Sequence, residues 1–321
     1  MNKGERIMLT RINYLGYAFQ NILFKRFNIN KYVEKSRLRY GGHSFISASE
    51  ANAKISKFLS EKQTCAVARI GSVELLLTRQ YREIQLRIRK EYSVDARQQL
   101  CQCAGFFPNE QKLINQFAEL MIESLEKMDL LGVWYNPMEN YFVSQTENNM
   151  VCTPLVGLEP WYYENPWSKA LKGKKVLVIH PFSESIERQY KYHDKLFPNN
   201  MIPDFDLHIV KAVQTIAGQV DERFDTWFEA LEYMYKECQK VDFDVAIIGC
   251  GAYGLPLAAK LKSHGKQVIH LGGATQLMFG IKGKRWDEIP RISQYYNEFW
   301  VRPNQNETVK GGNKVENGCY W

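Results

Sequence analysis

The chain has 321 residues, 45% of them hydrophobic and 24% charged, which is typical of a globular protein with one large or two modest domains. Its 42 basic and 35 acidic residues give a net charge of +7, which suits anionic ligands or membranes, and no polybasic tract predicts a nucleic-acid partner. No apolar run reaches the roughly 18 residues of a membrane span. We expect no secretory signal, and the odd number of cysteines, seven, favours reduced thiols and a cytoplasmic protein.

Residues 1–45 are predicted to form an N-terminal helical extension. Between residues 8 and 23 the apolar residues recur at helical spacing, and basic residues lie between and beside them. Two interpretations are open. The helix either covers the body of the protein or lies in a membrane surface, so that residues 1–40 would make a peripheral contact at the inner face of the membrane.

Residues 46–168 are predicted to form a first α/β lobe. A capping box at Ser47 and Glu50 begins a helix, and a short apolar run from Cys65 then reads as a strand that ends at a turn. This turn carries Arg69, Gly71, Ser72 and Glu74. If Ser72 caps the next helix and Glu74 lies in its first turn, helix stability alone explains both residues and no ligand is needed. The alternative is a site, because ligands bind where parallel strands end, and a guanidinium with a carboxylate suits a phosphate and a sugar hydroxyl.

Residues 169–303 are predicted to form a second, Rossmann-like lobe. A proline-punctuated aromatic segment precedes it, which either stacks on a sugar or packs as a connection between lobes. The buried strand 176–179 ends at His180, which either binds a ligand or donates to a nearby carbonyl. A strand at 207–212 and a helix at 224–238 follow. Strands that alternate with helices predict an α/β fold with a doubly wound, mostly parallel sheet.

The segment with the strongest chemical signal runs from Asp242 to Asp287. A β-branched strand leads into the glycine pattern Gly249, Gly251, Gly254, and a helix and another strand follow. Such glycines let backbone N–H groups approach a phosphate at a helix N-terminus, although a tight turn that packs a helix on a strand has the same pattern. The acidic residue that a dinucleotide fold places about 20 residues later is missing, so we do not expect an ordinary NAD enzyme.

A second glycine turn follows the last strand. It contains Gly272, Gly273 and Gln276, and the basic residues Lys282, Lys284 and Arg285 come soon after it. These residues form either a second anion contact or a solvated basic loop. A polar tail, residues 304–321, closes on Cys319, Tyr320 and Trp321, whose apolar side chains predict that the end of the chain docks back onto the body.

Four motifs, ARIGSVELL, KVLVIHPF, IIGCGAYGLPLAAKLK and HLGGATQLMFGIKGKRWD, resemble proteins encoded among bacterial surface-polysaccharide genes, a group similar to the GT-D-fold glycosyltransferases. The resemblance covers residues 45–303 and the last three. It implies a Rossmann-like nucleotide-binding fold with an Asp-x-Glu motif at which a divalent metal meets the sugar-nucleotide diphosphate. Arg69, Gly71 and Glu74 hold their places in that motif, whereas Ser72 stands at the position of its Asp, which puts metal dependence in question.

We therefore expect a glycosyltransferase that moves a sugar from a nucleotide sugar to a surface-glycan or lipid-linked acceptor. Another Rossmann-like polysaccharide-processing transferase and a non-catalytic nucleotide-binding partner are the alternatives. Glu74 or His180 is expected to be the catalytic base, and Glu74 to be the ligand of Mn²⁺ or Mg²⁺ if the cation is used. The predicted nucleotide-binding residues are Arg69, Gly71, Ser72, Gly249, Gly251, Tyr253, Gly254, Gly272, Gly273, Gln276, Lys282 and Arg285.

Overall fold

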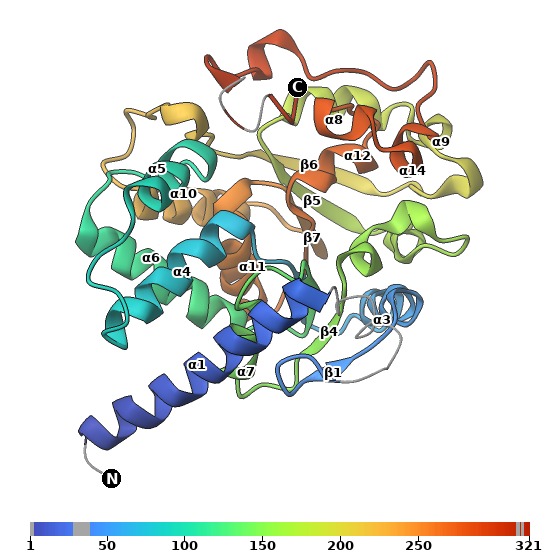
Figure 1. Ribbon diagram of the computed structural model, residues 1–321. Helices are drawn as coiled ribbons and strands as arrows, with labels where there is room; N and C mark the ends of the chain where they lie inside the picture. Colours follow the sequence, from blue (N-terminus) through green and yellow to red (C-terminus); the bar gives the residue numbers. More distant parts are fainter. Residues whose placement is uncertain (1–2, 28–38, 313–314, 316–317) are drawn as a thin grey trace.

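A computed structural model describes residues 3–27, 39–312, 315 and 318–321 (Figure 1). The remaining parts of the predicted N-terminal extension and of the tail lie outside the described residues. Among the described residues, no helix is both long and apolar enough to span a bilayer.

The centre of the molecule is one eight-stranded sheet with the order β1-β4-β3-β2-β8-β7-β5-β6. Every pair of neighbouring strands runs parallel, which confirms the predicted α/β class. The predicted first lobe contributes β2, β3 and β4, the second contributes β5 to β8, and β1 lies at the end of the predicted N-terminal extension; the two lobes meet where β2 pairs with β8. The strands are β1 Ser44–Phe45, β2 Cys65–Ala68, β3 Leu130–Val133, β4 Val151–Pro154, β5 Lys175–His180, β6 Asp206–Lys211, β7 Val245–Ile248 and β8 Gln267–His270.

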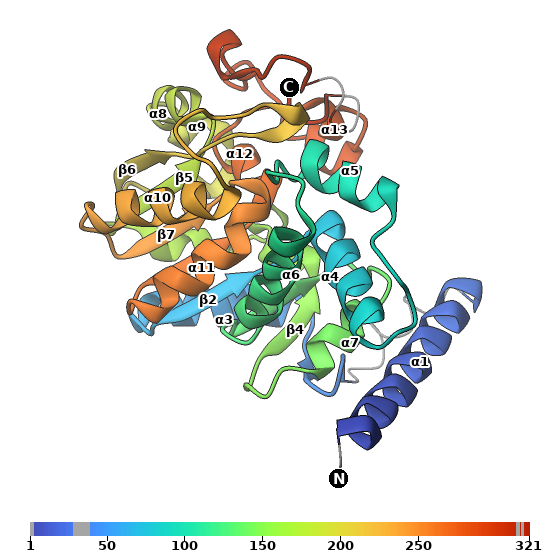
Figure 2. The ribbon, with the colours of Figure 1, turned by 90° about the vertical axis from the view of Figure 1, so that its left-hand side faces the viewer.

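Helices cover both faces of this sheet, as its parallel strands require. In Figure 2, α4, α6, α10 and α11 lie over one face, while α3, α8 and the short C-terminal helices belong to the other. The helices are α1 Lys3–Phe27, α3 Ala48–Ser60, α4 Ser72–Gln85, α5 Val94–Cys103, α6 Gln111–Leu125, α7 Glu139–Ser144, α8 Ser183–Tyr190, α9 His193–Leu196, α10 Trp227–Gln239, α11 Gly254–Ser263, α12 Thr275–Met278, α13 Lys284–Asp287 and α14 Pro290–Ser293.

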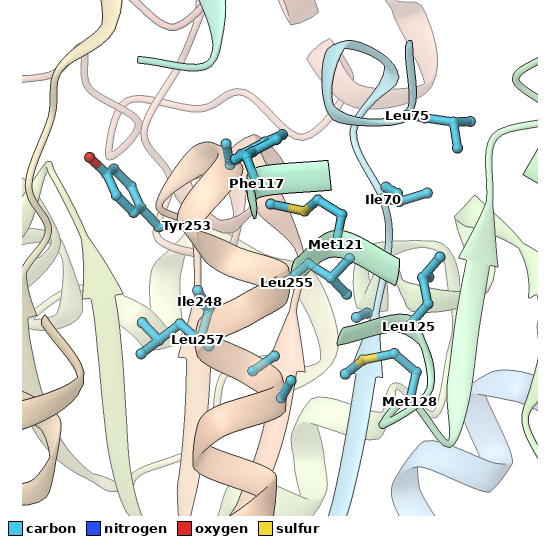
Figure 3. Packing of buried hydrophobic residues seen from close by; sticks show 14 of the residues in the cluster. Ile70, Leu75, Phe117, Met121, Leu125, Met128, Ile248, Tyr253, Leu255 and Leu257 are labelled. Atoms are coloured by element: carbon cyan, nitrogen blue, oxygen red, sulfur yellow. The ribbon is translucent and has the colours of Figure 1, made fainter. Parts of the chain in front are cut away.

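Successive residues of the central strands face opposite cores, which explains why these strands read as continuous apolar runs. In β7, Ala246 and Ile248 join the core under α11, whereas Val245 and Ile247 join the core on the other face. Figure 3 shows the first core, which includes Ile248 of β7, Leu255 and Leu257 of α11 and apolar residues of α6 such as Met121. All four residues of β7 are fully buried.

Two sequence-based predictions about helix starts have different outcomes. The capping box of α3 is confirmed, since the backbone N–H of Glu50 donates to the Ser47 hydroxyl at 3.2 Å and the Glu50 carboxylate accepts from the Ser47 N–H at 2.9 Å. The predicted cap at Ser72 is wrong. Gly71 is the N-cap of α4 without any side-chain bond, and Ser72 is the first helical residue. Ser72 is therefore exposed in the first turn of the helix and does not cap it.

The aromatic segment before β5 is a packed connection. Trp167 is fully buried and its indole N–H donates to the carbonyl of Leu158 at 2.9 Å, while Trp161 is 5% exposed. Both rings belong to the core on the α3 face of the sheet. Tyr162 and Tyr163 are less buried and line a separate hollow together with Trp161, so the sugar-stacking alternative stays a prediction.

Candidate functional site

The predicted site residues converge where β2, β8, β7 and β5, four neighbouring strands, end at the carboxyl edge of the sheet. Two connected hollows lie there. The larger, which we call the cationic cleft, has a cavity volume of about 320 Å³ and carries Arg69, Glu74 and Arg285 on its walls. The second, which we call the apolar pocket, lies beside His180 and is lined by side chains such as Phe182 and Val213. Both hollows share Cys103, Ala104, Gly251, Gly273 and Tyr320.

The three glycines of the predicted phosphate turn do different things. A Cβ on Gly249 would lie 2.5 Å from Cδ2 of His180, and one on Gly254 would lie 2.0 Å from Cε1 of His270. These two glycines therefore let a histidine from each neighbouring strand pack against the turn. Gly251 differs, because its φ is +59° and a Cβ there would meet no atom within 4 Å. Gly251 is thus the glycine of the pattern whose backbone is open to a ligand.

His180 is a buried, neutral imidazole at the end of β5. Its Nδ1 accepts a hydrogen bond from the backbone N–H of Phe182 at 2.9 Å, so the proton of the neutral ring is on Nε2. Burial lowers the pKa of His180 to about 3. A ring whose lone pair is already engaged, and whose charged form is disfavoured, is a hydrogen-bond donor at neutral pH and a poor base.

His270 ends β8 and mirrors His180 on the other side of β7. Its Nδ1 lies 3.2 Å from the carbonyl of Ile248, and burial, helped by the charge of Arg69, lowers its pKa to about 3. His270 was not among the residues predicted from the sequence, and it lies in the region where the acidic residue of a dinucleotide fold is missing. The same strand-end rule that selected His180 applies to it equally well.

Arg69 lines the cationic cleft. Its guanidinium carbon is 4.1 Å from the ring centroid of Trp134, and a Cβ on Gly272 would lie 3.0 Å from its Nη1. The guanidinium is thus held between an indole from the end of β3 and the glycine turn after β8. Burial lowers the pKa of Arg69, while the nearby Glu74 raises it, and arginine keeps its charge throughout. A fixed guanidinium cation suits a phosphate.

Trp134 is a site residue that the sequence reasoning missed. It directly follows β3, and the buried carboxylate of Glu139 holds its backbone by accepting from the N–H groups of Trp134 and Asn136 at 3.1 and 3.0 Å. Burial raises the pKa of Glu139 to about 7, against these hydrogen bonds. The position of Trp134 at a strand end was the available signal.

Glu74 is folded back over the start of α4. A Cβ on Gly71 would fall 2.0 Å from Oε2 of Glu74, so any larger residue at position 71 would displace this carboxylate. Burial raises the pKa of Glu74, and its own backbone N–H and Arg69 act in the opposite direction. A half-buried carboxylate with a raised pKa in a cleft is a candidate acid or base.

The end of the chain completes the site, as its apolar residues predicted. Tyr320 lines both hollows, and the carbonyl of Tyr320 accepts from Nε2 of Gln276 at 3.1 Å. A Cβ on Gly273 would lie 2.5 Å from the Tyr320 ring. Two of the predicted anion contacts therefore hold the tail: Gln276 through its amide and Gly273 through its lack of a side chain.

Arg285 and Lys282, the two cations predicted to bind the nucleotide, lie in different places. Arg285 lines the cationic cleft, with its guanidinium carbon 5.1 Å from the Tyr320 ring centroid and Nη2 3.3 Å from Sγ of Cys319. The ammonium of Lys282 instead lies 5.1 Å from the ring centroid of Tyr296. Tyr253 is buried and stacks on Trp227 at 4.5 Å, so it forms a wall of the apolar pocket.

A buried carboxylate anchors the tail that carries Tyr320. Glu307 is 4% exposed and accepts from the N–H groups of Glu184 and Ser185 at 2.8 and 3.2 Å, at the N-terminus of α8. The Ser185 hydroxyl donates to the other oxygen of Glu307. An acceptor at a helix N-terminus satisfies its free N–H groups, so this contact fastens the tail to the second lobe.

Comparisons with known proteins give a family for the chain. Two solved structures of the domain of unknown function 1792, one described as having a distinct glycosyltransferase fold and the other its selenomethionine-substituted form, are each 11% identical to this chain. They cover 73% of it and 79% and 80% of their own chains, with a TM-score of 0.43. No curated protein matches the sequence. The family model for the GT-D fold-like domain matches residues 46–278, which include both glycine turns and the Arg69–Glu74 turn, and the chain therefore belongs to the GT-D fold-like family.

Proposed function

We propose that this protein is a glycosyltransferase that binds a nucleotide-diphosphate sugar and transfers the sugar to a glycan or lipid-linked acceptor of surface-polysaccharide assembly. The observation that carries the proposal is the convergence of Arg69, Arg285 and the open backbone of Gly251 on one cleft at the carboxyl edge of a parallel sheet. Ligands of open α/β sheets bind at this edge. Membership of the GT-D fold-like family supports the choice of glycosyl transfer.

The charges of the cleft suit a diphosphate leaving group. Arg69 and Arg285 both line it, and a departing nucleoside diphosphate gains negative charge as the sugar bond breaks. Cations fixed in place before the reaction stabilise that charge without reorganisation. Lys282, which points to Tyr296, has no such role in this proposal. The adjoining apolar pocket offers its aliphatic and aromatic walls to the sugar or the base.

Glu74 is the proposed base for the acceptor hydroxyl. Burial raises the pKa of Glu74 towards neutral pH, and a general base is most effective when its pKa lies near the pH of the reaction. His180 was the other predicted base. With Nδ1 occupied by the Phe182 N–H, we propose that its Nε2–H donates to an oxygen of the ligand.

The role of Glu74 as a ligand of Mn²⁺ or Mg²⁺ stays a prediction, and the donor set fits such a cation poorly. Hard cations prefer several oxygen ligands with carboxylates among them. In the described part of the chain no three His, Cys, Asp or Glu side chains gather into a metal site, and Glu74 shares its cleft with two arginines. We therefore assign the neutralisation of the diphosphate to the arginines.

A thermal-shift panel of UDP, GDP, CDP, CMP and NAD, each with Mn²⁺ and with EDTA, tests the proposal. A diphosphate that fits raises the unfolding free energy by about 2.7 kcal/mol at a hundredfold excess over its Kd. We expect one nucleoside diphosphate to act in both conditions. A response to NAD alone, or to none of the nucleotides, contradicts the proposal.

Glu74→Gln then separates binding from transfer. We expect this variant to keep the thermal shift and to lose transfer of the sugar from the matching nucleotide sugar. Glu229→Gln is the matched control, because Glu229 holds the same position in the first turn of α10 as Glu74 holds in α4. Unchanged transfer by the Glu74 variant removes this residue from the mechanism.

A non-catalytic nucleotide-binding role in glycan assembly is the second candidate. It is favoured by Ser72, which stands where the resembled motif has a carboxylate and leaves its hydroxyl exposed at the start of α4. In that case the nucleoside diphosphate binds, and neither the wild type nor the Glu74 variant transfers or hydrolyses the sugar.

A further inference from the structure

Helix α1 packs on the body through its polar and aromatic face. Tyr14 is 2% exposed, its ring centroid is 4.9 Å from that of Tyr141, and its hydroxyl donates to Glu83 at 2.8 Å. About two turns further on, Nδ2 of Asn21 donates to Oδ1 of Asn140 at 2.9 Å. These contacts hold one side of α1 against α4 and α7, and they fix which side faces outward.

The outward side of α1 is apolar. Its residues follow each other at i, i+4, i+7, i+11 and i+14, which places them in one stripe along the helix. The stripe consists of Met8 64%, Ile12 56%, Leu15 46%, Phe19 63% and Ile22 63% exposed. Contiguous apolar surface of this kind marks an interaction site, whereas single exposed apolar residues are common. Figures 1 and 2 show α1 in blue along one side of the molecule, with its N-terminal part projecting beyond the body.

The charges of α1 indicate what covers the stripe. The helix contains five basic residues and one acidic residue, and Arg11, Lys25 and Arg26 are exposed. A second copy of the same helix would bring like charges together, which opposes self-association through this face. A bilayer with anionic headgroups offers both a negative surface for the cations and an apolar interior for the stripe.

We propose that α1 is an interfacial helix that binds this protein to an anionic membrane surface, with the stripe in the bilayer and the tyrosine face on the body. Long basic side chains beside the stripe reach the headgroups while their stems lie on the apolar surface. The contact is independent of the chemistry in the cationic cleft. It answers the question that the sequence left open, since α1 both packs on the body and keeps an apolar face outward.

Cosedimentation of the full-length chain with vesicles tests the proposal. Vesicles of phosphatidylcholine with phosphatidylglycerol are compared with pure phosphatidylcholine, at low and high salt. We expect binding to the anionic vesicles only, weakened by salt. The double variant Ile12→Ser, Phe19→Ser should bind the anionic vesicles about tenfold more weakly for each substitution, because each one removes an apolar side chain from the bilayer. Val94→Ser is the control, since Val94 is 82% exposed and lies on α5.

Three outcomes overturn the proposal. The first is that the wild type does not bind anionic vesicles, and the second is that the Ile12 and Phe19 double variant binds them as well as the wild type does. The third is that the double variant converts an oligomer into a monomer in sedimentation velocity without lipid, which would assign the stripe to a second copy of the chain. Equal thermal midpoints of wild type and variants show that the fold is intact, as expected for exposed positions.

Discussion

Gly251 allows the proposed ligand contact to be separated from the structural need for glycine. Its φ is +59°, a backbone angle that residues other than glycine adopt at a cost of roughly 1–2 kcal/mol. A Cβ there would meet no protein atom within 4 Å and would project into the space shared by the two hollows. Gly251→Ala therefore adds backbone strain without a clash, and it puts a methyl group where a phosphate would approach the backbone.

Gly265 provides the matched control. Its φ is +77°, and a Cβ there also meets no atom within 4 Å. It follows α11 at the end opposite to Gly251, and the helix between the two glycines is about 15 Å long. We expect Gly251→Ala and Gly265→Ala to lower the unfolding free energy equally, by about 1 kcal/mol.

Inorganic pyrophosphate is the probe, because it tests the turn without depending on the base or the sugar. We expect isothermal titration to show a Kd at least about tenfold weaker for Gly251→Ala, which corresponds to ~1.4 kcal/mol, and an unchanged Kd for Gly265→Ala. Equal pyrophosphate affinity in both variants and the wild type would refute the reasoning, because the open glycine would then serve the backbone alone.

Three further predictions follow from the same edge of the sheet. Gly254→Ala puts a Cβ 2.0 Å from the His270 ring, and chemical denaturation should show a loss of about 1–3 kcal/mol; a loss of under half a kilocalorie would contradict the packing role. Arg69→Met should weaken pyrophosphate binding at least about tenfold, whereas Arg223→Met, at another aromatic contact, should not; equal affinities would remove Arg69 from the ligand site. Burial lowers the pKa of His180 and His270 from 6.5 to about 3, so folding stability is kept above pH 6.5 and lost as the pH falls towards 3. Below pH 6.5 each histidine lowers the unfolding free energy by about 1.4 kcal/mol per pH unit. His180→Asn should therefore flatten the dependence of the unfolding free energy on pH, measured with urea between about pH 5 and 6.5; an unchanged slope would contradict the buried neutral state of His180.

The fold class and much of the candidate site follow from local patterns in the sequence. Buried strands of a parallel sheet are apolar on both faces, so runs such as 245–248 can be recognised without knowing their neighbours. The rule that ligands lie at strand ends then selects Arg69, Glu74 and His180, and the structure brings all three to one edge of the sheet. The sequence also predicts the docking of Tyr320, because apolar residues end an otherwise polar tail.

Only the tertiary structure decided which side chains meet and what each glycine is for. The pairing of β2 with β8 joins residues about 200 positions apart, and no local pattern specifies such a neighbour. That pairing places Gly272 against Arg69, and the end of β3 adds Trp134 on the other side. A short motif shows that glycines are present, but whether a missing side chain makes room for a histidine, a carboxylate or a ligand depends on the atoms that other strands bring beside it.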